Sequence, residues 1–382
     1  MILYFSSAIP YVEYNKALGT ELITVGQQAQ KFNHLLIEGL STHDRVIAIS
    51  NPPYNKKGKN ECIDSKSLKY CVSGGNSSRT TRKSSNIIQM FKFAKREILR
   101  ERCSAIIVDS INLGAIFVAK LIGSIQKIPV IGVVTDVPEF MCKGRMNLAL
   151  RIDAWLMKRL DGYVLLTEEM NNVANPSGKP HIVMEGSCEV TYCNKEIALS
   201  DDISKKVCLF SGSVNEANGI NILVKAFQMS SLSDVDLHIY GSGPYTEKLV
   251  QACRRHSNIL YNGTVRNDIV VNKQKEADLL INPRPSNIEF GAFSFPSKLI
   301  EYMASGTPVL TTRLPGIPIE YYDYVYVIED ESPSGIAVAI RNALHEKRNL
   351  GIAAQKFVCE KKNNIEQARR IYEFAFKIVK NK

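Results

Sequence analysis

A base and a carboxylate lie three residues apart at the start of an expected helix, a spacing that could bind an anion. Pro296 suits a first helical turn and Gly306 a helix end, so this helix includes Lys298 and Glu301. It follows an expected strand that ends near Asn282, and a helix that begins beyond strand ends presents free N–H groups to a phosphate. Lys298 stands where the helix dipole favours an acidic residue, and a bound anion would explain that choice.

Ser297 and Lys298 precede Glu301 by four and three residues, so all three share one face of the helix. A cation for phosphate would then lie beside a carboxylate for ribose hydroxyl groups. The same spacing is more often that of a solvated surface pair. The pattern alone therefore leaves a nucleotide site and a surface ion pair both open.

The rest of the chain alternates between short apolar runs and amphipathic helices. The expected strands are 2–6, 45–50, 105–109, 130–135, 162–167 and 181–184 in the first half, and 207–211, 235–240, 259–261, 278–282, 308–311 and 324–328 in the second. Runs that are apolar on both faces and separated by helices indicate parallel sheets. We expect an α/β chain of two doubly wound, Rossmann-like domains, with the divisions 1–190, hinge 191–206, 207–363 and a C-terminal helix over 364–382.

The length and composition agree with this division. A chain of 382 residues exceeds one ordinary core, and 45% apolar with 23% charged residues is typical of a globular protein. The sequence has no uninterrupted run of eighteen apolar residues, so we expect no membrane-spanning helix. The first residues do not resemble a signal peptide. The nine cysteines form no Cys-x-x-Cys pair, so we interpret them as reduced thiols of a cytoplasmic protein.

No resident metal is expected, because the histidines and cysteines form no spaced ligand set. Asp234 and Asp236 have an Asp-x-Asp spelling, but they open an expected strand, and two carboxylates alone do not complete an oxygen-ligand shell. Gly241 and Gly243 follow a strand without the third glycine of a dinucleotide fingerprint, which disfavours a dehydrogenase.

The net charge of +10 is concentrated in the first domain, where residues 51–102 hold 13 Lys and Arg against 4 Asp and Glu. Such a cluster indicates an anionic partner or a solvated basic loop, and the pattern does not decide between them. Residues 52–85 are rich in Ser, Asn, Lys and Gly, so we expect a long mobile loop there. It leads into an amphipathic helix over 87–102 whose basic face carries Lys92, Lys95, Arg96 and Arg100.

A second basic amphipathic stretch covers residues 140–160. Basic amphipathic helices bind anionic membranes in some proteins, and more often pack on a sheet with their charges in water. The aromatic residues among the basic ones are scattered, which disfavours a nucleic-acid-binding protein, the alternative from a different class.

The segment Phe293–Leu310 resembles the donor-binding motif of family-four retaining glycosyltransferases of the GT-B fold, and is closest to the branch of bacterial surface-polysaccharide and capsule pathways. Further similar segments occur in the expected order along nearly the whole chain: 134–139, 165–170, 184–186, 209–219, 239–244, 261–265 and 314–318. The resemblance implies two domains facing a central cleft, with the C-terminal helix crossing back to the first domain. The second domain would hold a nucleotide-diphosphate sugar and the first domain the acceptor.

In the second domain, the resemblance implies that Glu301 binds the ribose and that Lys298 and Arg284 face the donor diphosphate, with Ser297 beside them. The sequence also departs from the family. Phe293 occupies the place of the first glutamate of the Glu-x7-Glu motif, and Glu289 is the candidate to replace it near the sugar.

Two further assignments follow from the resemblance. Ser213 and Asn218 stand where the family has an arginine and a lysine, so more of the diphosphate charge would be met by the other two cations. Asp136, at an expected strand end in the first domain, matches a polar catalytic-loop position. An aspartate that caps the turn before Pro138 explains Asp136 equally well.

The function that the resemblance implies is hexosyl transfer, with retention, to a lipid-linked saccharide or glycan, by a cytoplasmic protein peripheral at the inner face of the membrane. Neither a cofactor nor a metal would be required, because fixed cations stabilise the leaving diphosphate. An anionic membrane surface would be the second partner. A nucleotide-sugar epimerase of the same fold is the alternative enzyme, and it would need no basic acceptor face.

Overall fold

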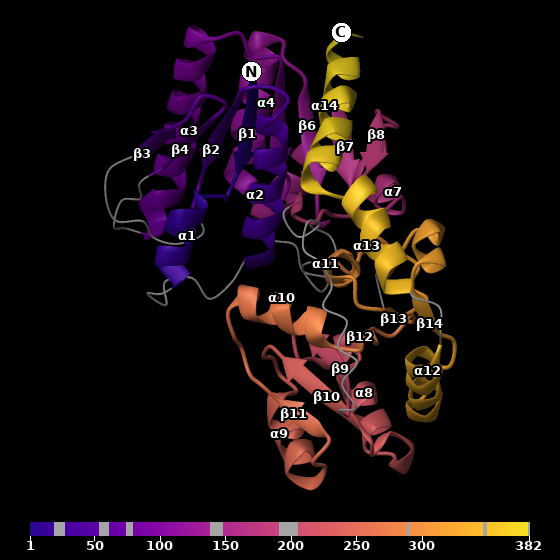
Figure 1. Ribbon diagram of the computed structural model, residues 1–382. Coiled ribbons are helices and arrows are strands. Elements are labelled where there is room, and N and C mark those ends of the chain that lie inside the picture. Colours follow the sequence, from indigo (N-terminus) through magenta and orange to yellow (C-terminus); the bar gives the residue numbers. More distant parts are fainter. Residues whose placement is uncertain are drawn as a thin grey trace. The chain divides into compact units, whose positions relative to one another are not determined.

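The computed structural model describes residues 1–18, 27–52, 61–73, 79–137, 148–190, 205–288, 291–346 and 350–380 (Figure 1). Its contacts divide the chain into two compact units, Met1–Ser187 with Asn364–Lys382, and Cys188–Asn363. From the sequence, the first domain is expected to end at residue 190 and a hinge to cover residues 191–206. Residues 191–204 lie outside the described residues, and Lys206 already begins a strand of the second unit.

The first unit is built on an eight-stranded sheet with the order β3-β4-β2-β1-β5-β6-β7-β8, parallel except for β3. The strands are β1 Ile2–Ser6, β2 Val46–Ser50, β3 Glu61–Asp64, β4 Leu68–Val72, β5 Ala105–Asp109, β6 Val130–Val134, β7 Gly162–Leu165 and β8 His181–Val183. Strands β1, β2, β5 and β6 are buried along their whole length, as expected for runs that are apolar on both faces.

The helices of this unit are α1 Tyr11–Leu18, α2 Gln27–Ser41, α3 Arg79–Arg100, α4 Leu113–Gln126, α6 Leu148–Met157, α7 Met170–Ala174 and α14 Asn364–Lys380. Helix α14, yellow in Figure 1, contacts α2. Its apolar stripe, which includes Ala368, Ile371 and Phe374, joins the core formed by β1, β2 and β5. The expectation that the C-terminal helix returns to the first domain is confirmed.

The expectation of a mobile loop over residues 52–85 is wrong for its described parts. Residues 61–72 form the antiparallel pair β3 and β4, and α3 begins at Arg79. Because residues 52–85 are polar on average, their composition did not indicate strand β4, in which Tyr70, Cys71 and Val72 are buried. Lys69, between Leu68 and Tyr70, is also buried, and an ion pair with Glu97 of α3 compensates its charge.

The second unit contains a six-stranded parallel sheet with the order β11-β10-β9-β12-β13-β14. This is the Rossmann order, in which the direction of progression reverses between the first strand and the fourth. The strands are β9 Lys206–Ser211, β10 Val235–Tyr240, β11 Ile259–Tyr261, β12 Leu279–Asn282, β13 Val309–Thr312 and β14 Tyr326–Ile328.

Helices cover both faces of the second sheet. They are α8 Ile220–Phe227, α9 Thr246–Arg255, α10 Asn267–Glu276, α11 Lys298–Ser305, α12 Pro333–His345 and α13 Leu350–Lys361, with short 3-10 turns η2 Glu216–Asn218, η3 Ser230–Leu232, η4 Gly291–Phe293 and η5 Ile319–Asp323. One core cluster joins the sheet to α8 and α12, and a second joins it to α11 and α13. The expectation of an α/β chain with two Rossmann-like domains is confirmed.

Two further expectations concern membrane crossing and thiols. No helix within the described residues is long and apolar enough to cross a membrane. Cys71, Cys103, Cys188 and Cys208 are buried and form no disulfide bond. Cys359 is disulfide-bonded, so the expectation that all nine cysteines are reduced is wrong for this residue.

Candidate functional site

The loops that follow strands β9 and β10 are joined at the carboxyl edge of the second sheet. The N–H of Gly212 donates to the carbonyl oxygen of Tyr240 at 2.9 Å, and that of Val214 donates to the carbonyl oxygen of Ser242 at 3.0 Å. In an open parallel sheet this edge, at the point where the strand order reverses, is where ligands bind. The two loops therefore form one wall of a candidate site.

Glycines allow the backbones at this edge to approach closely. A Cβ atom on Gly241 would lie 1.9 Å from the carbonyl oxygen of Gly212, and Gly241 has φ +125°. A Cβ atom on Gly219, with φ +77°, would lie 1.8 Å from the carbonyl oxygen of Pro283. Both positions require glycine. Gly241 brings the loop after β10 against the loop after β9, and Gly219 brings the loop after β9 against the segment after β12.

Lys298 opens helix α11 and places its ammonium group inside this edge. The residue as a whole is partly exposed, but Nζ is buried and donates no hydrogen bond to any of the described residues. Nζ lies 4.2 Å from the centroid of the Phe210 ring, and a Cβ atom on Gly212 would be 3.0 Å from it. Burial, together with the charge of Arg284, lowers the pKa of Lys298 to about 7. A buried cation without a hydrogen-bond partner indicates that a ligand supplies one.

Arg284 provides the second cation, two residues after β12. Its Nη1 donates to the Ser294 hydroxyl at 3.2 Å, and its carbonyl oxygen accepts from the Thr312 hydroxyl. Burial lowers the pKa of the Arg284 guanidinium. Two partly desolvated cations that disfavour each other are a costly arrangement without an anion. A diphosphate would offset the repulsion.

Glu301 lies in the first turn of α11, and the buried side-chain amide of Gln274 donates a hydrogen bond to it. Its Oε1 accepts from Nε2 of Gln274 at 3.0 Å, and the same Nε2 donates to the Ser211 hydroxyl at 3.2 Å. The hydroxyl group of Tyr302 accepts from the N–H of Ser211 at 2.7 Å. These contacts fix the Glu301 carboxylate beside the end of β9.

Three residues that support this site were not predicted from the sequence: Gln274, Ser211 and Tyr302. Gln274 carried a detectable signal, because it shares a face of α10 with the buried Val271 and is itself fully buried. An amide on the apolar face of a helix needs a polar partner inside the protein. Ser211 and Tyr302 offered no such signal, since their contact depends on the folded arrangement.

The remaining donor-side candidates also lie in the second unit. Ser213 is exposed in the loop after β9, where its hydroxyl group accepts from Asn215 and its carbonyl oxygen accepts from Asn218, both at 2.9 Å. Amide hydrogen bonds thus brace the loop in which the sequence lacks the two cations of the resembling family. Ser297 is exposed at the N-cap position of α11, and Phe293 is partly buried in η4.

Of the two residues expected to act in catalysis, only Asp136 lies within the described residues. Glu289 lies outside the described residues. Asp136 follows β6 in the first unit, whereas the donor-side residues belong to the second. Asp136 is exposed, but the surrounding protein partly desolvates its carboxyl group and raises its pKa.

Asp136 has a buried neighbour in Asp109, at the end of β5. Burial raises the pKa of Asp109, and the charge of Asp136 raises it further, against the hydrogen bonds that Asp109 accepts. Those bonds come from Nδ2 of Asn33 at 2.9 Å and from the N–H of Ile111 at 3.1 Å. The carboxyl edge of the first sheet therefore holds two electrostatically coupled carboxyl groups.

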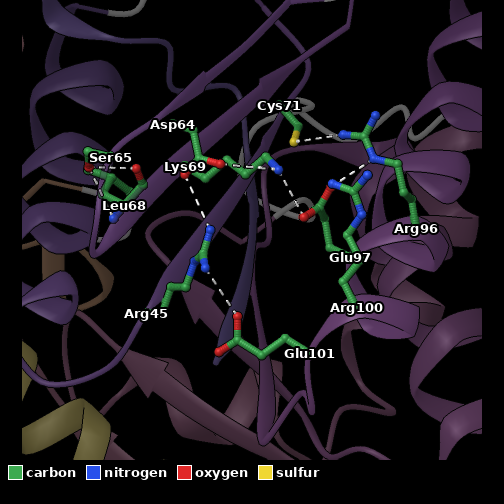
Figure 2. A network of polar contacts seen from close by, with 10 residues as sticks. All are labelled: Arg45, Asp64, Ser65, Leu68, Lys69, Cys71, Arg96, Glu97, Arg100 and Glu101. Atoms are coloured by element: carbon green, nitrogen blue, oxygen red, sulfur yellow. Dashed lines mark hydrogen bonds and ion pairs between the residues drawn. The ribbon is translucent and has the colours of Figure 1, made fainter.

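The basic face expected on α3 is only partly available to a partner. Lys92, Lys95 and Arg100 are exposed. Arg96 Nε donates to Oε1 of the buried Glu97 at 2.8 Å, and Arg100 lies 3.9 Å from the same oxygen. Figure 2 shows Glu97 between these two arginines and Lys69, whose Nζ lies 3.0 Å from Oε2.

Although burial alone would raise the pKa of Glu97, its hydrogen bonds with Lys69 and Arg96 lower it. Glu97 is therefore a carboxylate that compensates part of the charge of α3. Among the described residues, no group of three or more His, Cys, Asp or Glu is arranged to hold a metal ion.

Comparisons with known proteins match a family model to the second unit. Residues 205–346, which contain the Lys298, Arg284 and Glu301 cluster, match the family model "Glycosyl transferases group 1". N-acetyl-alpha-D-glucosaminyl L-malate synthase of Bacillus anthracis is 26% identical over 181 residues, and the match covers 45% of each chain. The chain thus matches less than half the length of this curated relative.

Solved structures resemble the chain over its whole length. Sucrose-phosphate synthase of Thermosynechococcus elongatus has a TM-score of 0.72 at 14% identity, with all of both chains covered. Anabaena HepE in complex with UDP-glucose has a TM-score of 0.63 at 13% identity, with 98% of both chains covered. The chain has the fold of GT-B glycosyltransferases, and its residues 205–346 are similar to the group 1 glycosyltransferases.

Proposed function

We propose that the protein transfers a hexosyl group from a nucleotide-diphosphate sugar to a hydroxyl group of a lipid-linked saccharide or glycan, with retention of anomeric configuration. The observation that carries this proposal is the buried ammonium group of Lys298, which lies close enough to Arg284 for the two charges to interact. A doubly charged anion satisfies that arrangement better than water does. Glu301, held by Gln274, is then available for the ribose hydroxyl groups.

The proposed reaction breaks the bond between the anomeric carbon and the leaving diphosphate oxygen. A new bond forms between that carbon and the acceptor oxygen, and the acceptor proton passes to the leaving phosphate. Negative charge therefore develops on the diphosphate, where Lys298 and Arg284 lower the barrier because they are fixed in a poorly solvated site. We assign Glu289 to the sugar and Asp136 to the acceptor side, as the sequence resemblance implies.

This proposal needs neither a cofactor nor a metal, because the two cations take the role of a Lewis acid. Support for the donor class comes from HepE, a structural neighbour that was solved with UDP-glucose. Support for a lipid-linked acceptor comes from the basic character of the first unit, which suits a polysaccharide pathway, such as that of a capsule, at the cytoplasmic face of a membrane.

The test is mass spectrometry of acceptor saccharides after incubation of the purified protein with a panel of nucleotide sugars. We expect one donor to add one hexosyl mass and to release nucleoside diphosphate only when acceptor is present. Release or isomerisation of the donor without acceptor would instead favour the epimerase. Lys298→Met should abolish transfer, whereas Lys225→Met, an exposed lysine on α8 of the same unit, should leave it unchanged.

A further inference from the structure

Helix α4 of the first unit exposes an unusual row of large apolar side chains. Phe117, Leu121 and Ile125 are exposed by 47%, 40% and 59%. Their spacing of four residues places them on one face of the helix. The opposite face, with Ile116, Ala119 and others, packs on the sheet. The exposed row therefore adds nothing to the core of this unit.

Helix α6 contacts α4 and exposes a similar row. Leu148, Ile152 and Trp155 are exposed by 74%, 49% and 53%, at spacings of four and three residues. The two rows together form what we call the α4–α6 surface. Contiguous exposed apolar side chains of this size mark interaction sites more often than chance positions do.

Basic side chains surround the α4–α6 surface. Arg151, Arg159 and Lys127 are exposed. The guanidinium group of Arg159 lies 3.9 Å from the centroid of the Trp155 ring. In the sequence of the two helices and the residues that end them, 113–127 and 148–159, there are five basic residues and a single acidic one, an aspartate at 153. Within the described part of the chain, neither Arg151 nor Arg159 forms an ion pair like those of the α3 arginines with Glu97.

We propose that the α4–α6 surface docks the protein on an anionic lipid bilayer. Apolar and aromatic side chains would enter the headgroup boundary, and the surrounding cations would meet lipid phosphates. The inference rests on the proposed lipid-linked acceptor, and it identifies the surface of the first unit that would contact the lipid. It also differs from the expectation for α3, since Glu97 compensates two of the arginines there.

A second copy of the chain is a less suitable occupant. A two-fold contact through this surface would bring the basic residues that surround it in one copy close to those of the other. Like charges brought together at a contact oppose association. An anionic bilayer, in contrast, satisfies both the apolar rows and the cations.

Trp155 provides a direct probe, because it is the only tryptophan of the sequence. Intrinsic emission of the full chain should shift to shorter wavelength with vesicles of phosphatidylcholine and phosphatidylglycerol, and brominated acyl chains should quench it. Phosphatidylcholine vesicles alone should have little effect, and salt should reverse the shift. Sedimentation with anionic vesicles without any change of emission would overturn the proposal, because docking would then use another surface.

Variants test the two components separately. Phe117→Ser/Ile125→Ser and Arg151→Gln/Arg159→Gln should each weaken partitioning into anionic vesicles at least tenfold. The matched control is Ile319→Ser/Val338→Ser, which alters two exposed apolar residues of the second unit and should have no effect. Lys92→Gln/Lys95→Gln on α3 should weaken partitioning less than the Arg151 and Arg159 pair does.

Two further measurements distinguish the possible failures. Titration with UDP, or with the nucleoside diphosphate that binds, should give the same affinity for all these variants, since the donor site lies in the second unit. If the wild type binds no nucleoside diphosphate, the proposed function is wrong. If the variants partition into anionic vesicles as well as the wild type does, only the docking surface is wrong. A wild-type dimer that Phe117→Ser/Ile125→Ser dissociates in ultracentrifugation would assign the surface to self-association and overturn the proposal.

Discussion

Replacing Lys298 by methionine should stabilise the ligand-free protein while it destroys the anion site. The pKa of Lys298 falls from 10.5 to about 7 through burial and the charge of Arg284. A pKa change of one unit corresponds to about 1.36 kcal/mol, so keeping Lys298 protonated at pH 7 destabilises the folded state by on the order of 5 kcal/mol. Methionine avoids this cost and loses the attraction of Nζ to the Phe210 ring, about 1 kcal/mol. The expected gain in the free energy of unfolding is therefore at most about 4 kcal/mol.

The pH dependence of this gain has a defined sign. Between the folded pKa near 7 and the unfolded value of 10.5, the unfolded chain binds more protons at Lys298 than the folded chain does. The stability of the wild type therefore rises with pH in this window, and the variant lacks that rise. Urea unfolding at pH 7 and pH 9 should show the advantage of the variant shrinking by about 2–3 kcal/mol.

Lys225→Met is the matched control, because it removes an exposed lysine from the same unit. Its free energy of unfolding should stay within about 0.5 kcal/mol of the wild type at both pH values. A Lys298→Met protein that is less stable than the wild type at pH 7, or a difference that does not change with pH, would refute the reasoning. Nζ would then be solvated, or paired with a group of the protein itself.

The remaining predictions concern the donor site in solution. Affinity for nucleoside diphosphate should fall as pH rises above 7, by up to about tenfold per unit, because the proton on Lys298 is lost; calorimetry in buffers of different ionisation enthalpy should detect proton uptake on binding. Glu301→Gln should weaken free diphosphate and donor sugar together by about tenfold. Gln274→Leu should weaken both less, and equal losses would contradict a supporting role. Glu289→Gln should slow transfer without changing diphosphate affinity, as titration beside kinetics would reveal. Transfer should survive a strong chelator, and complete loss of activity would reveal a metal requirement.

The fold was predictable because its strands are buried on both faces. Ile2–Ser6 and Ala105–Asp109 are mostly apolar runs that are buried along their whole length, and the structure places both at the expected residues. Strands β3 and β4 were not predictable from composition. Their segment is polar, and Lys69 becomes compatible with a buried strand only through Glu97, which lies 28 residues away.

The donor site was partly predictable, since the helix start at Lys298 and the position of Glu301 follow from local spacing. The burial of Nζ was not, because it depends on Phe210 and Gly212 at the end of a distant strand. Gln274 meets Ser211 across 63 residues of sequence. Such contacts form only when the loops of the parallel sheet converge, and no local pattern encodes them.

The proposed function depends on a diphosphate held by Lys298 and Arg284 in the second unit. The most direct test is calorimetric titration at pH 7 of the wild type and Lys298→Met with nucleoside diphosphates and the corresponding monophosphates. One diphosphate should bind the wild type at least tenfold more tightly than its monophosphate, and this preference should disappear in the variant. Equal affinity of that diphosphate for both proteins would contradict the central claim.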